Sequence, residues 1–284
     1  MSINTIGVVG AGTMGSGIAQ AAAVSGCAVV LQDVSEEQIA RARKGIERSL
    51  SRLVDKGAVD RNVMDNALAS ITTTTAVDDL AGADMVIEAA VENMDLKLEL
   101  FAKLDRLMKA GAVLASNTSS LSLTRLAAAT ARPDKVVGMH FFNPVPLMKL
   151  VEVIRALQTS DETHALADEF ARRLGKVPVS VKDSPGFVVN RMLVPMINEA
   201  VFLLYEGVAS AGEIDEAMKL GANHPIGPLA LADMIGVDVC YFVMQILLEE
   251  FGDSKYRPCP LLKQMVGAGR PGRKSGRGFF DYAA

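Results

Sequence analysis

Apolar residues follow two alternating patterns through the first two thirds of the chain. Short runs rich in Val, Ile, Leu, Ala and Met recur along it, and the segments between them place apolar residues every three to four positions. The first pattern is typical of strands buried on both faces of a parallel sheet, and the second is typical of amphipathic helices. The sequence therefore predicts a doubly wound α/β fold, with buried parallel strands at residues 6–9, 28–32, 85–88, 113–116 and 136–139.

Capping signals mark where two of the helices begin. Ser35 and Gln38 have the spacing of a capping box and predict a helix over residues 35–56, and Ser210 with Glu213 repeats this spacing in the last third of the chain. The side chains of the first helix that we expect to face the core are Ile39, Ala42, Ile46, Leu50 and Leu53.

The strand pattern stops near a Ser-Pro-Gly turn at residues 184–186, and the remaining chain is predicted to be helical. We therefore predict two domains, an α/β domain over residues 1–184 and an all-α domain over residues 185–284. The second domain is small for an independent core. Its long apolar helices, expected at 188–205 and 229–251, are predicted to pack against a partner subunit as well as against each other.

The overall charge excludes some classes of partner. The chain has 284 residues, a formal net charge of −4 and a pI near 5.5, so we expect no general attraction for nucleic acid or for an anionic membrane. The three cysteines, Cys27, Cys240 and Cys259, lie far apart, which favours a reducing compartment without a disulfide framework. No spacing of metal-ligating residues indicates zinc or another metal.

Two apolar stretches need an explanation other than a membrane. Residues 3–31 carry no charge, but they lack a basic leader and are interrupted by glycines and polar residues. Residues 229–248 contain Asp233 and Asp238, which favour a buried helix over a membrane span. We therefore expect a cytoplasmic protein.

A glycine-rich turn, GAGTMG at residues 10–15, follows the first predicted strand and opens a helix. The three glycines have the spacing of the Rossmann motif, in which a helix N-terminus holds a dinucleotide pyrophosphate. Asp33 ends the second predicted strand, where a carboxylate accepts hydrogen bonds from the adenosine ribose. Glu36 and Glu37 would repel a 2′-phosphate, and no arginine precedes Arg41 in this helix. These residues favour NAD over NADP.

A basic stripe follows one face of the predicted helix at residues 35–56. Its members, at intervals of three and four positions, are Arg41, Lys44, Arg48, Arg52 and Lys56. Such a stripe can simply be a solvated surface. Beside a dinucleotide fold in an acidic protein, it can instead bind a second ligand rich in phosphate.

Of the three histidines, His140 has the most informative position. His164 lies in a polar helical segment and His224 precedes a proline in a turn, whereas His140 ends a predicted strand at the edge where open α/β sheets bind ligands. If the chain reverses about Pro146 and pairs antiparallel, Glu152 faces His140 across the two strands. A carboxylate there would fix the imidazole tautomer for acid–base catalysis. A purely structural histidine is the alternative.

Two polar positions at element ends are further candidates for the site. The sequence SNTSS at residues 116–120 follows a predicted strand, and Asn190 begins the first helix after the domain boundary. Ser119 or Asn190 can contact a ligand, but for either residue taken alone the sequence favours a helix cap.

Several segments together resemble the L-3-hydroxyacyl-CoA dehydrogenase family. They are GAGTMGSGIA, AAVENMDLK, ASNTSSLS, GMHFFNPVPLMKLVEV, DSPGFVVNR and HPIGPLALADMIGVD, and the resemblance covers nearly the whole chain. The length is similar to that of the stand-alone 3-hydroxybutyryl-CoA dehydrogenases of bacteria. The resemblance implies NAD-dependent interconversion of an (S)-3-hydroxyacyl-CoA and a 3-ketoacyl-CoA, and a homodimer formed through the helical domain.

The resemblance also implies residue roles. His140 would take the proton of the 3-hydroxyl group, and Glu152 would orient His140. Ser119 and Asn190 would hydrogen-bond the reacting oxygen and the thioester region. The implied cofactor-binding residues are Gly10, Gly12, Thr13, Met14, Gly15, Asp33, Glu92, Lys97, Ser119, Asn143 and Lys274, and those implied for the acyl-CoA substrate are Ser49, Arg52, Lys56, Ser119 and Asn190.

Two other functions remain open from the sequence. A protein that binds NAD(H) for a structural or redox-sensing purpose uses the same fold without catalysis. A dehydrogenase of a free 3-hydroxy acid would need a lysine base, for which Lys182 or Lys219 would serve. For the acyl-CoA function, we expect a short acyl group of four carbons.

Overall fold

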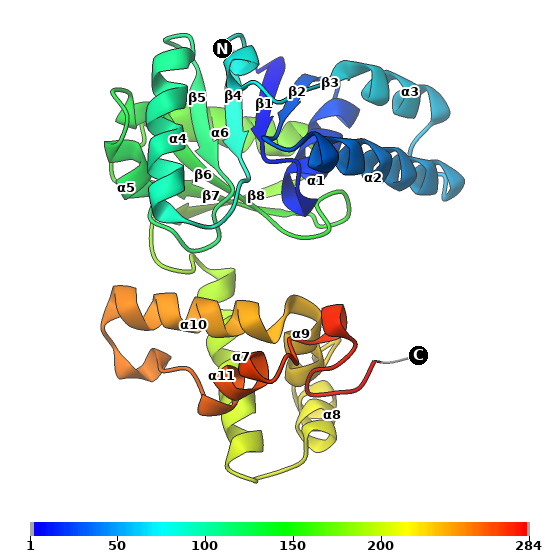
Figure 1. The fold of residues 1–284 in the computed structure, drawn as a ribbon, viewed down its shortest axis with the longest axis vertical. Helices are drawn as coiled ribbons and strands as arrows, with labels where there is room; N and C mark the ends of the chain where they lie inside the picture. Colours follow the sequence, from blue (N-terminus) through cyan, green and yellow to red (C-terminus); the bar gives the residue numbers. More distant parts are fainter. Residues whose placement is uncertain (1–2, 283–284) are drawn as a thin grey trace. The chain divides into compact units, whose positions relative to one another are not determined.

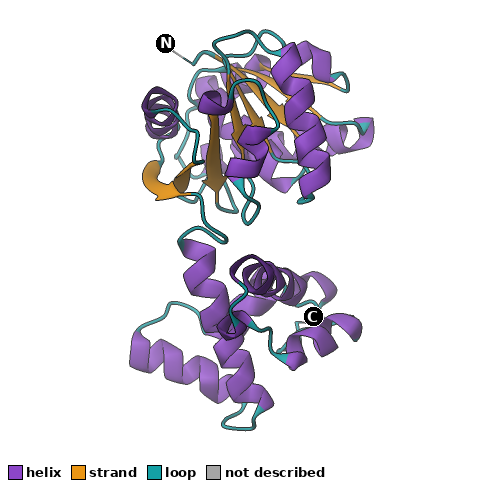
Figure 2. Ribbon diagram, turned by 90° about the vertical axis from the view of Figure 1, so that its left-hand side faces the viewer, coloured by secondary structure: helices purple, strands orange, loops and turns teal. Residues whose placement is uncertain are grey.

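The computed structural model describes residues 3–282, and the chain divides between Ser184 and Pro185 into two compact units. Figure 1 shows the elements of each unit, and Figure 2 shows that the first contains the strands whereas the second is built from helices.

The first unit contains one sheet with the strand order β3-β2-β1-β4-β5-β6-β7-β8. Every neighbouring pair is parallel except β6 and β7, which are antiparallel. The order reverses at β1, which is the switch point of a doubly wound fold. The strands are β1 (Thr5–Val9), β2 (Ala28–Gln32), β3 (Ile71–Thr74), β4 (Met85–Glu88), β5 (Val113–Ser116), β6 (Val136–Phe141), β7 (Leu150–Arg155) and β8 (Val177–Lys182).

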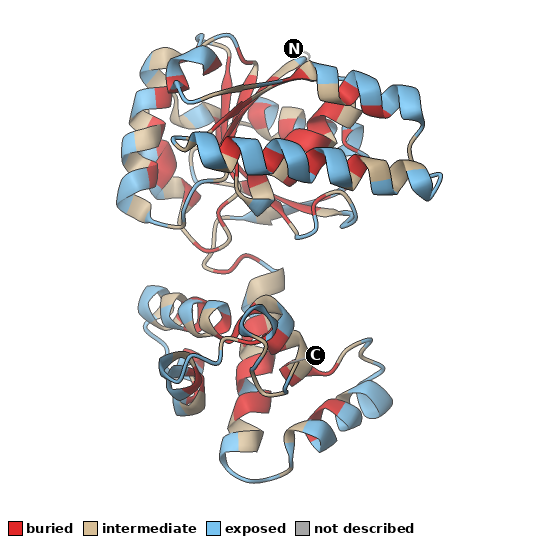
Figure 3. Cartoon of the chain, turned by 45° about the vertical axis from the view of Figure 1, so that its right-hand side comes forward, coloured by how far each residue is buried: buried red, intermediate tan, exposed pale blue. Residues whose placement is uncertain are grey.

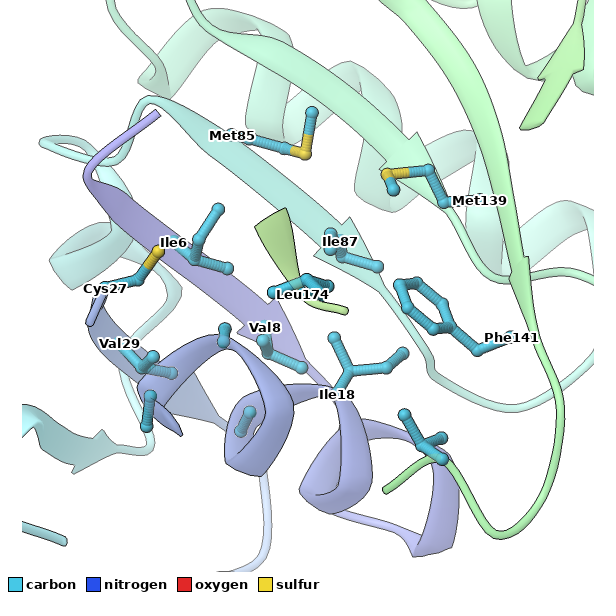
Figure 4. Close-up of a cluster of buried hydrophobic side chains, with 14 of the residues drawn as sticks. Ile6, Val8, Ile18, Cys27, Val29, Met85, Ile87, Met139, Phe141 and Leu174 are labelled. Carbon is cyan, nitrogen blue, oxygen red and sulfur yellow. The ribbon is translucent and has the colours of Figure 1, made fainter. Parts of the chain in front are cut away.

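Helices cover both faces of this sheet because side chains that alternate along its central strands are apolar on both sides. On one face, Ile6, Val8 and Ile87 pack with Ile18 of α1 (Figure 4). Buried residues are concentrated in the sheet and on the inward sides of its helices (Figure 3). The face of the sheet that carries Ile6, Val8 and Ile87 is covered by α1 (Thr13–Val24), α2 (Glu36–Asp55), α3 (Arg61–Ser70) and α6 (Asp161–Arg173). The opposite face is covered by α4 (Met94–Leu107) and α5 (Leu123–Ala128).

The five predicted strands are confirmed, with β1 beginning one residue earlier and β6 ending two residues later than expected. Sequence patterns missed two edge strands. β3 has the sequence ITTT and offers little apolar signal. β8 contains Pro178 and exposes Val177 and Val179. Both lie at the ends of the sheet, where burial on two faces is not required.

The helix predicted at 35–56 is α2, and its expected core side chains are buried except Leu53, which is half-buried. The capping box at its start is only half formed. The Ser35 hydroxyl accepts from the Gln38 N–H, but the Ser35 N–H donates to Asp33 instead of to Gln38. The capping box of Ser210 and Glu213 is complete.

The second unit is helical, as predicted, but residues 229–251 do not form one helix. Gly236 has φ +114°, a conformation that favours glycine, and it separates two helices that meet at 95°. Within residues 3–282, only this bent pair has the length and apolar composition of a membrane span, and no single helix does. The helices of the unit are α7 (Val189–Tyr205), α8 (Ala211–Ala222), α9 (Pro228–Ile235), α10 (Val237–Phe251) and α11 (Pro260–Gly267).

Candidate active site

The glycine turn has the geometry that a pyrophosphate requires. Gly10 has φ +97°, and its N–H donates to the Gln32 carbonyl at 2.8 Å. A Cβ on Gly15 would lie 1.7 Å from the Gly10 carbonyl oxygen, so α1 can approach the turn only with glycine at this position. A Cβ on Gly12 would meet no protein atom within 4 Å. Gly12 therefore leaves open space at the N-terminus of α1, the position at which this motif binds a pyrophosphate.

Asp33 ties the second strand to this turn. Its Oδ2 accepts from the Ala11 N–H at 2.7 Å, and its Oδ1 accepts from the Ser35 N–H at 2.9 Å. Each oxygen retains a second lone pair for a ribose hydroxyl. A cavity of about 820 Å³ is lined by Gly10, Gly12 and Asp33, so the residues present fit a dinucleotide. Thr13, which is exposed, and Met14, which packs on the core, begin α1 beside this turn.

The predicted pairing of His140 and Glu152 is confirmed. They are register partners in the antiparallel strands β6 and β7, and His140 Nδ1 lies 2.7 Å from Glu152 Oε2. His140 is 6% exposed and Glu152 is 1% exposed. With Nδ1–H donating to the carboxylate, a neutral imidazole carries its lone pair on Nε2. This arrangement suits a general base whose cationic form is stabilised by Glu152.

Glu92 accepts several hydrogen bonds from the loop that contains Ser119. Its Oε1 accepts from the Ser119 N–H at 3.0 Å and from the Thr118 hydroxyl at 2.5 Å, and its Oε2 lies 3.3 Å from Lys97 Nζ. Burial opposes the charged form of Glu92, but Lys97 and the hydrogen bonds from Thr118 and Ser119 outweigh it and lower the pKa of Glu92. Glu92 is therefore a carboxylate at neutral pH, and it is hydrogen-bonded to Ser119, which the family resemblance implies as a substrate contact.

Lys97 is buried in this cluster, although it also lines the large cavity. Its Nζ lies 2.5 Å from Glu88, a residue that sequence reasoning missed. The sequence does contain one indication of its role, because Glu88 is a carboxylate at the end of β4, a strand that is otherwise apolar. Asn143 lies exposed in the turn between β6 and β7, and the nearby Asn117 accepts from the Phe141 N–H at 2.8 Å.

The capping alternative for Ser119 and Asn190 is wrong. Ser122, not Ser119, caps α5, and Asn190 is the second residue of α7, whose N-cap is Val188. Asn190 and Lys274 belong to the helical unit. There Lys274 Nζ lies 2.6 Å from Asp238.

The lysines considered as alternative bases do not have suitable surroundings. Lys182 is exposed at the end of β8. Lys219 lies 2.6 Å from Glu216, and the hydrogen bond to this carboxylate raises the pKa of Lys219. A lysine base needs a lowered pKa, so the ion pair of Lys219 argues against catalysis by this residue.

The five cations of the basic stripe are exposed, four of them on α2 and Lys56 at its C-cap, and Arg41 pairs with Glu37 at 3.6 Å. Ser49, on the same helix, is half-buried. Among residues 3–282, no group of three or more His, Cys, Asp or Glu side chains is arranged to hold a metal ion.

Comparisons with known proteins identify the family. Residues 5–184 match the model of the 3-hydroxyacyl-CoA dehydrogenase NAD-binding domain, and residues 186–282 match the C-terminal domain of the same family. The chain is 52% identical to the probable 3-hydroxybutyryl-CoA dehydrogenase of Bacillus subtilis, over 99% of this chain and 98% of the relative. It is also 52% identical to the 3-hydroxybutyryl-CoA dehydrogenase of Bradyrhizobium diazoefficiens, over 99% and 96%.

A solved structure agrees with these relatives. The crystal structure of (S)-3-hydroxybutyryl-CoA dehydrogenase from Ralstonia eutropha superposes with a TM-score of 0.96 at 55% identity and covers 100% of both chains. The glycine turn, the paired His140 and Glu152 and the helical second unit thus occur in a sequence that matches one family along nearly its whole length. The chain belongs to the 3-hydroxyacyl-CoA dehydrogenase family.

Proposed function

We propose that this protein is an NAD-dependent dehydrogenase that interconverts (S)-3-hydroxyacyl-CoA and 3-ketoacyl-CoA, with 3-hydroxybutyryl-CoA and acetoacetyl-CoA as the preferred pair. The observation that carries the proposal is the buried hydrogen bond of 2.7 Å between His140 and Glu152 at the carboxyl edge of the sheet. The names of the relatives support the substrate class and the four-carbon acyl group.

His140 moves the proton in the proposed reaction. When bound, NAD supplies the hydride acceptor for C3 of the substrate. His140 Nε2 takes the proton of the 3-hydroxyl group, and Glu152 stabilises the resulting imidazolium through Nδ1–H. Ser119 and Asn190 hydrogen-bond the reacting oxygen and the thioester region and so orient C3. In the reducing direction, His140 returns the proton to the ketone oxygen.

The cofactor is held by the α/β unit. The N-terminus of α1 and the turn with Gly10, Gly12 and Gly15 hold the pyrophosphate, and Asp33 accepts from the ribose. The cavity residues that follow β2 run from Asp33 to Gln38 and offer no cation for a 2′-phosphate, whereas the two lysines of the lining, Lys97 and Lys103, belong to α4. This arrangement supports NAD over NADP. The other proposed contacts are Thr13, Met14, Glu92, Lys97, Ser119 and Asn143, with Lys274 from the helical unit.

The basic stripe on α2 is the proposed contact for coenzyme A. Arg52 and Lys56 are exposed cations at the C-terminal end of this helix, and Ser49 lies one turn earlier. Phosphate groups bind such cations through charge-assisted hydrogen bonds. A double substitution, R52A with K56A, is expected to raise KM for acetoacetyl-CoA about ten-fold, which corresponds to 1.4 kcal/mol, and to weaken its dependence on salt.

Arg43 provides the matched control for this substitution. It is exposed on the same helix outside the stripe, beside Glu47. R43A should leave KM within about two-fold, a change of a few tenths of a kcal/mol. An equal rise of KM in both variants would show that general surface charge, and not a coenzyme A contact, is responsible.

The helical unit is proposed to form a homodimer with a second copy of the chain. Its surface exposes several large apolar side chains, which a monomer would leave in water. We also propose a cytoplasmic location, since the three cysteines are free and buried. The exposed apolar residues are Met192, Val208, Leu220, Met234 and Phe242.

The decisive experiment is steady-state oxidation of NADH with acetoacetyl-CoA. Free acetoacetate, NADPH and longer 3-ketoacyl-CoAs serve as comparisons. We expect turnover with acetoacetyl-CoA and NADH and little with free acetoacetate or NADPH. Equal turnover of free acetoacetate would replace this function with that of a free 3-hydroxy acid dehydrogenase, and tight NADH binding without any turnover would favour a redox-sensing or structural role.

A further inference from the structure

Glu88 is a buried carboxylate with no part in the reaction described so far. It ends β4 and is 0% exposed. Its Oε1 accepts from the Ala90 N–H at 2.7 Å and from Lys97 Nζ at 2.5 Å, whereas its Oε2 accepts from the Ser116 hydroxyl at 2.6 Å. One carboxylate therefore joins three segments: the end of β4, helix α4 and the end of β5.

Lys97 connects Glu88 to the candidate active site. It is 1% exposed, and its ammonium lies 2.5 Å from Glu88 and 3.3 Å from Glu92. The formal charges of these three side chains sum to −1. Buried charges are stable only when paired and hydrogen-bonded, so the position of the ammonium depends on both carboxylates. Glu92 in turn accepts from the backbone N–H of Ser119.

The second oxygen of Glu88 acts on the same loop by another route. The Ser116 hydroxyl that donates to Glu88 accepts from the Thr118 N–H at 3.1 Å. The Thr118 hydroxyl then donates to Glu92 at 2.5 Å. The loop over residues 116–120 is thus held at Ser116 by Glu88 and at Thr118 and Ser119 by Glu92.

We propose that Glu88 is a positioning residue of this enzyme, which holds Lys97 and Ser119 in the geometry that the bound cofactor and substrate require. The proposal rests on the proposed function, which assigns Lys97 to the cofactor and Ser119 to the reacting oxygen. Glu88 acts through these residues and does not itself touch the reacting atoms.

The substitution E88Q removes the negative charge of Glu88 and keeps the size and shape of its side chain. A glutamine oxygen can still accept from the Ala90 N–H, and its amide can donate to the Ser116 hydroxyl, which keeps the side chain in place. In wild type, Lys97 pairs with both Glu88 and Glu92. E88Q removes the negative charge of the first, so that of these two partners Glu92 remains as a carboxylate. We expect the ammonium to shift towards Glu92 and to compete there with the donors from Thr118 and Ser119.

Asp84 provides a matched control at the opposite end of the same strand. It precedes β4, lies 2.5 Å from Lys109 and accepts from the N–H groups of Asn4 and Thr5 at 2.8 Å. D84N therefore also neutralises a carboxylate that pairs with lysine and accepts from backbone. It does so at the amino edge of the sheet, away from the glycine turn.

The experiment measures the melting temperature, the Kd for NADH from its fluorescence, and kcat and KM with acetoacetyl-CoA. For E88Q, kcat/KM for NADH should fall about ten-fold to 100-fold, since a displacement near 1 Å costs on the order of 100-fold. Its kcat with acetoacetyl-CoA should fall as well, because Ser119 is assigned to the reacting oxygen, whereas its KM for acetoacetyl-CoA should change less than about two-fold. D84N should lower the melting temperature while kcat/KM for NADH stays within about two-fold of wild type.

S116A provides a second variant that keeps every charge. It removes the partner of Glu88 Oε2 and should lower kcat/KM for NADH in the same direction by a smaller factor. Wild-type kinetics and NADH affinity in E88Q, or equal losses in E88Q and D84N, would overturn the proposal. If wild-type protein failed to turn over acetoacetyl-CoA, the proposed function would fall, and the NADH affinities of E88Q and D84N would still decide whether Glu88 positions the cofactor site.

Discussion

Replacing His140 with glutamine is expected to lower kcat about 10²-fold to 10⁴-fold, the usual contribution of a general base, while NADH still binds. Glutamine keeps a polar group of similar reach in β6, but it cannot take a proton. The imidazole is buried against Glu152 and lies in a different part of the sheet from the glycine turn. Stopped-flow or steady-state turnover of acetoacetyl-CoA, with NADH affinity from fluorescence, measures the two effects separately.

His164 supplies the control for H140Q. Its Nε2 lies 2.9 Å from the Ser180 hydroxyl near the edge strand β8. Burial and the nearby Arg155 lower the pKa of His164, so it is largely neutral at pH 7. H164Q should leave kcat within about two-fold. Near-normal turnover in H140Q would remove acid–base catalysis by His140 from the mechanism.

Replacing Gly12 with alanine is expected to weaken NADH binding about ten-fold or more, at least 1.4 kcal/mol, without loss of the fold. Gly12 has φ −69°, which alanine adopts readily, and a Cβ there would meet no protein atom within 4 Å. The added methyl group instead occupies space that the pyrophosphate needs at the start of α1. Titration of NADH fluorescence and a thermal melt test both parts.

Two other glycines give this experiment its controls. A Cβ at Gly45, within α2, also meets nothing within 4 Å, so G45A should raise stability by up to about 1 kcal/mol through helix propensity and leave NADH binding unchanged. A Cβ at Gly15 would collide with the Gly10 carbonyl, so G15A should unfold the turn. Unchanged NADH affinity in G12A would place the pyrophosphate elsewhere.

The sequence predicts the centre of the sheet better than its edges, for a physical reason. β4 and β5 are buried along their whole length, and β2 is exposed only at its first residue, Ala28, so the apolar runs of these three strands coincide with the observed strand bounds. The edge strands β3 and β8 need only one covered face or none, and threonine and proline dilute their pattern. The break at Gly236 was missed because the apolar pattern continues through both helices, and a single glycine does not indicate its own φ.

In the candidate site, the sequence predicts contacts between neighbouring segments of the chain better than contacts that depend on tertiary packing. His140 and Glu152 are 12 positions apart across one reversal of the chain, so strand register alone predicts their contact. The cluster of Glu88, Lys97 and Glu92 depends on how helix α4 lies against two strand ends. Charged residues at helical spacing normally indicate a solvated face, and only the tertiary structure shows that Lys97 is buried.

The antiparallel reversal between β6 and β7 simplifies how an acid–base pair is encoded. In a parallel sheet, two adjacent strands that both send residues to the carboxyl edge need a crossover of a dozen or more residues between them. A reversed strand instead reaches that edge with its beginning, so the start of β7 supplies Glu152 directly opposite His140. One short continuous segment of chain therefore carries both the base and its carboxylate. Insertions or deletions elsewhere in the α/β unit do not change the spacing between these two residues.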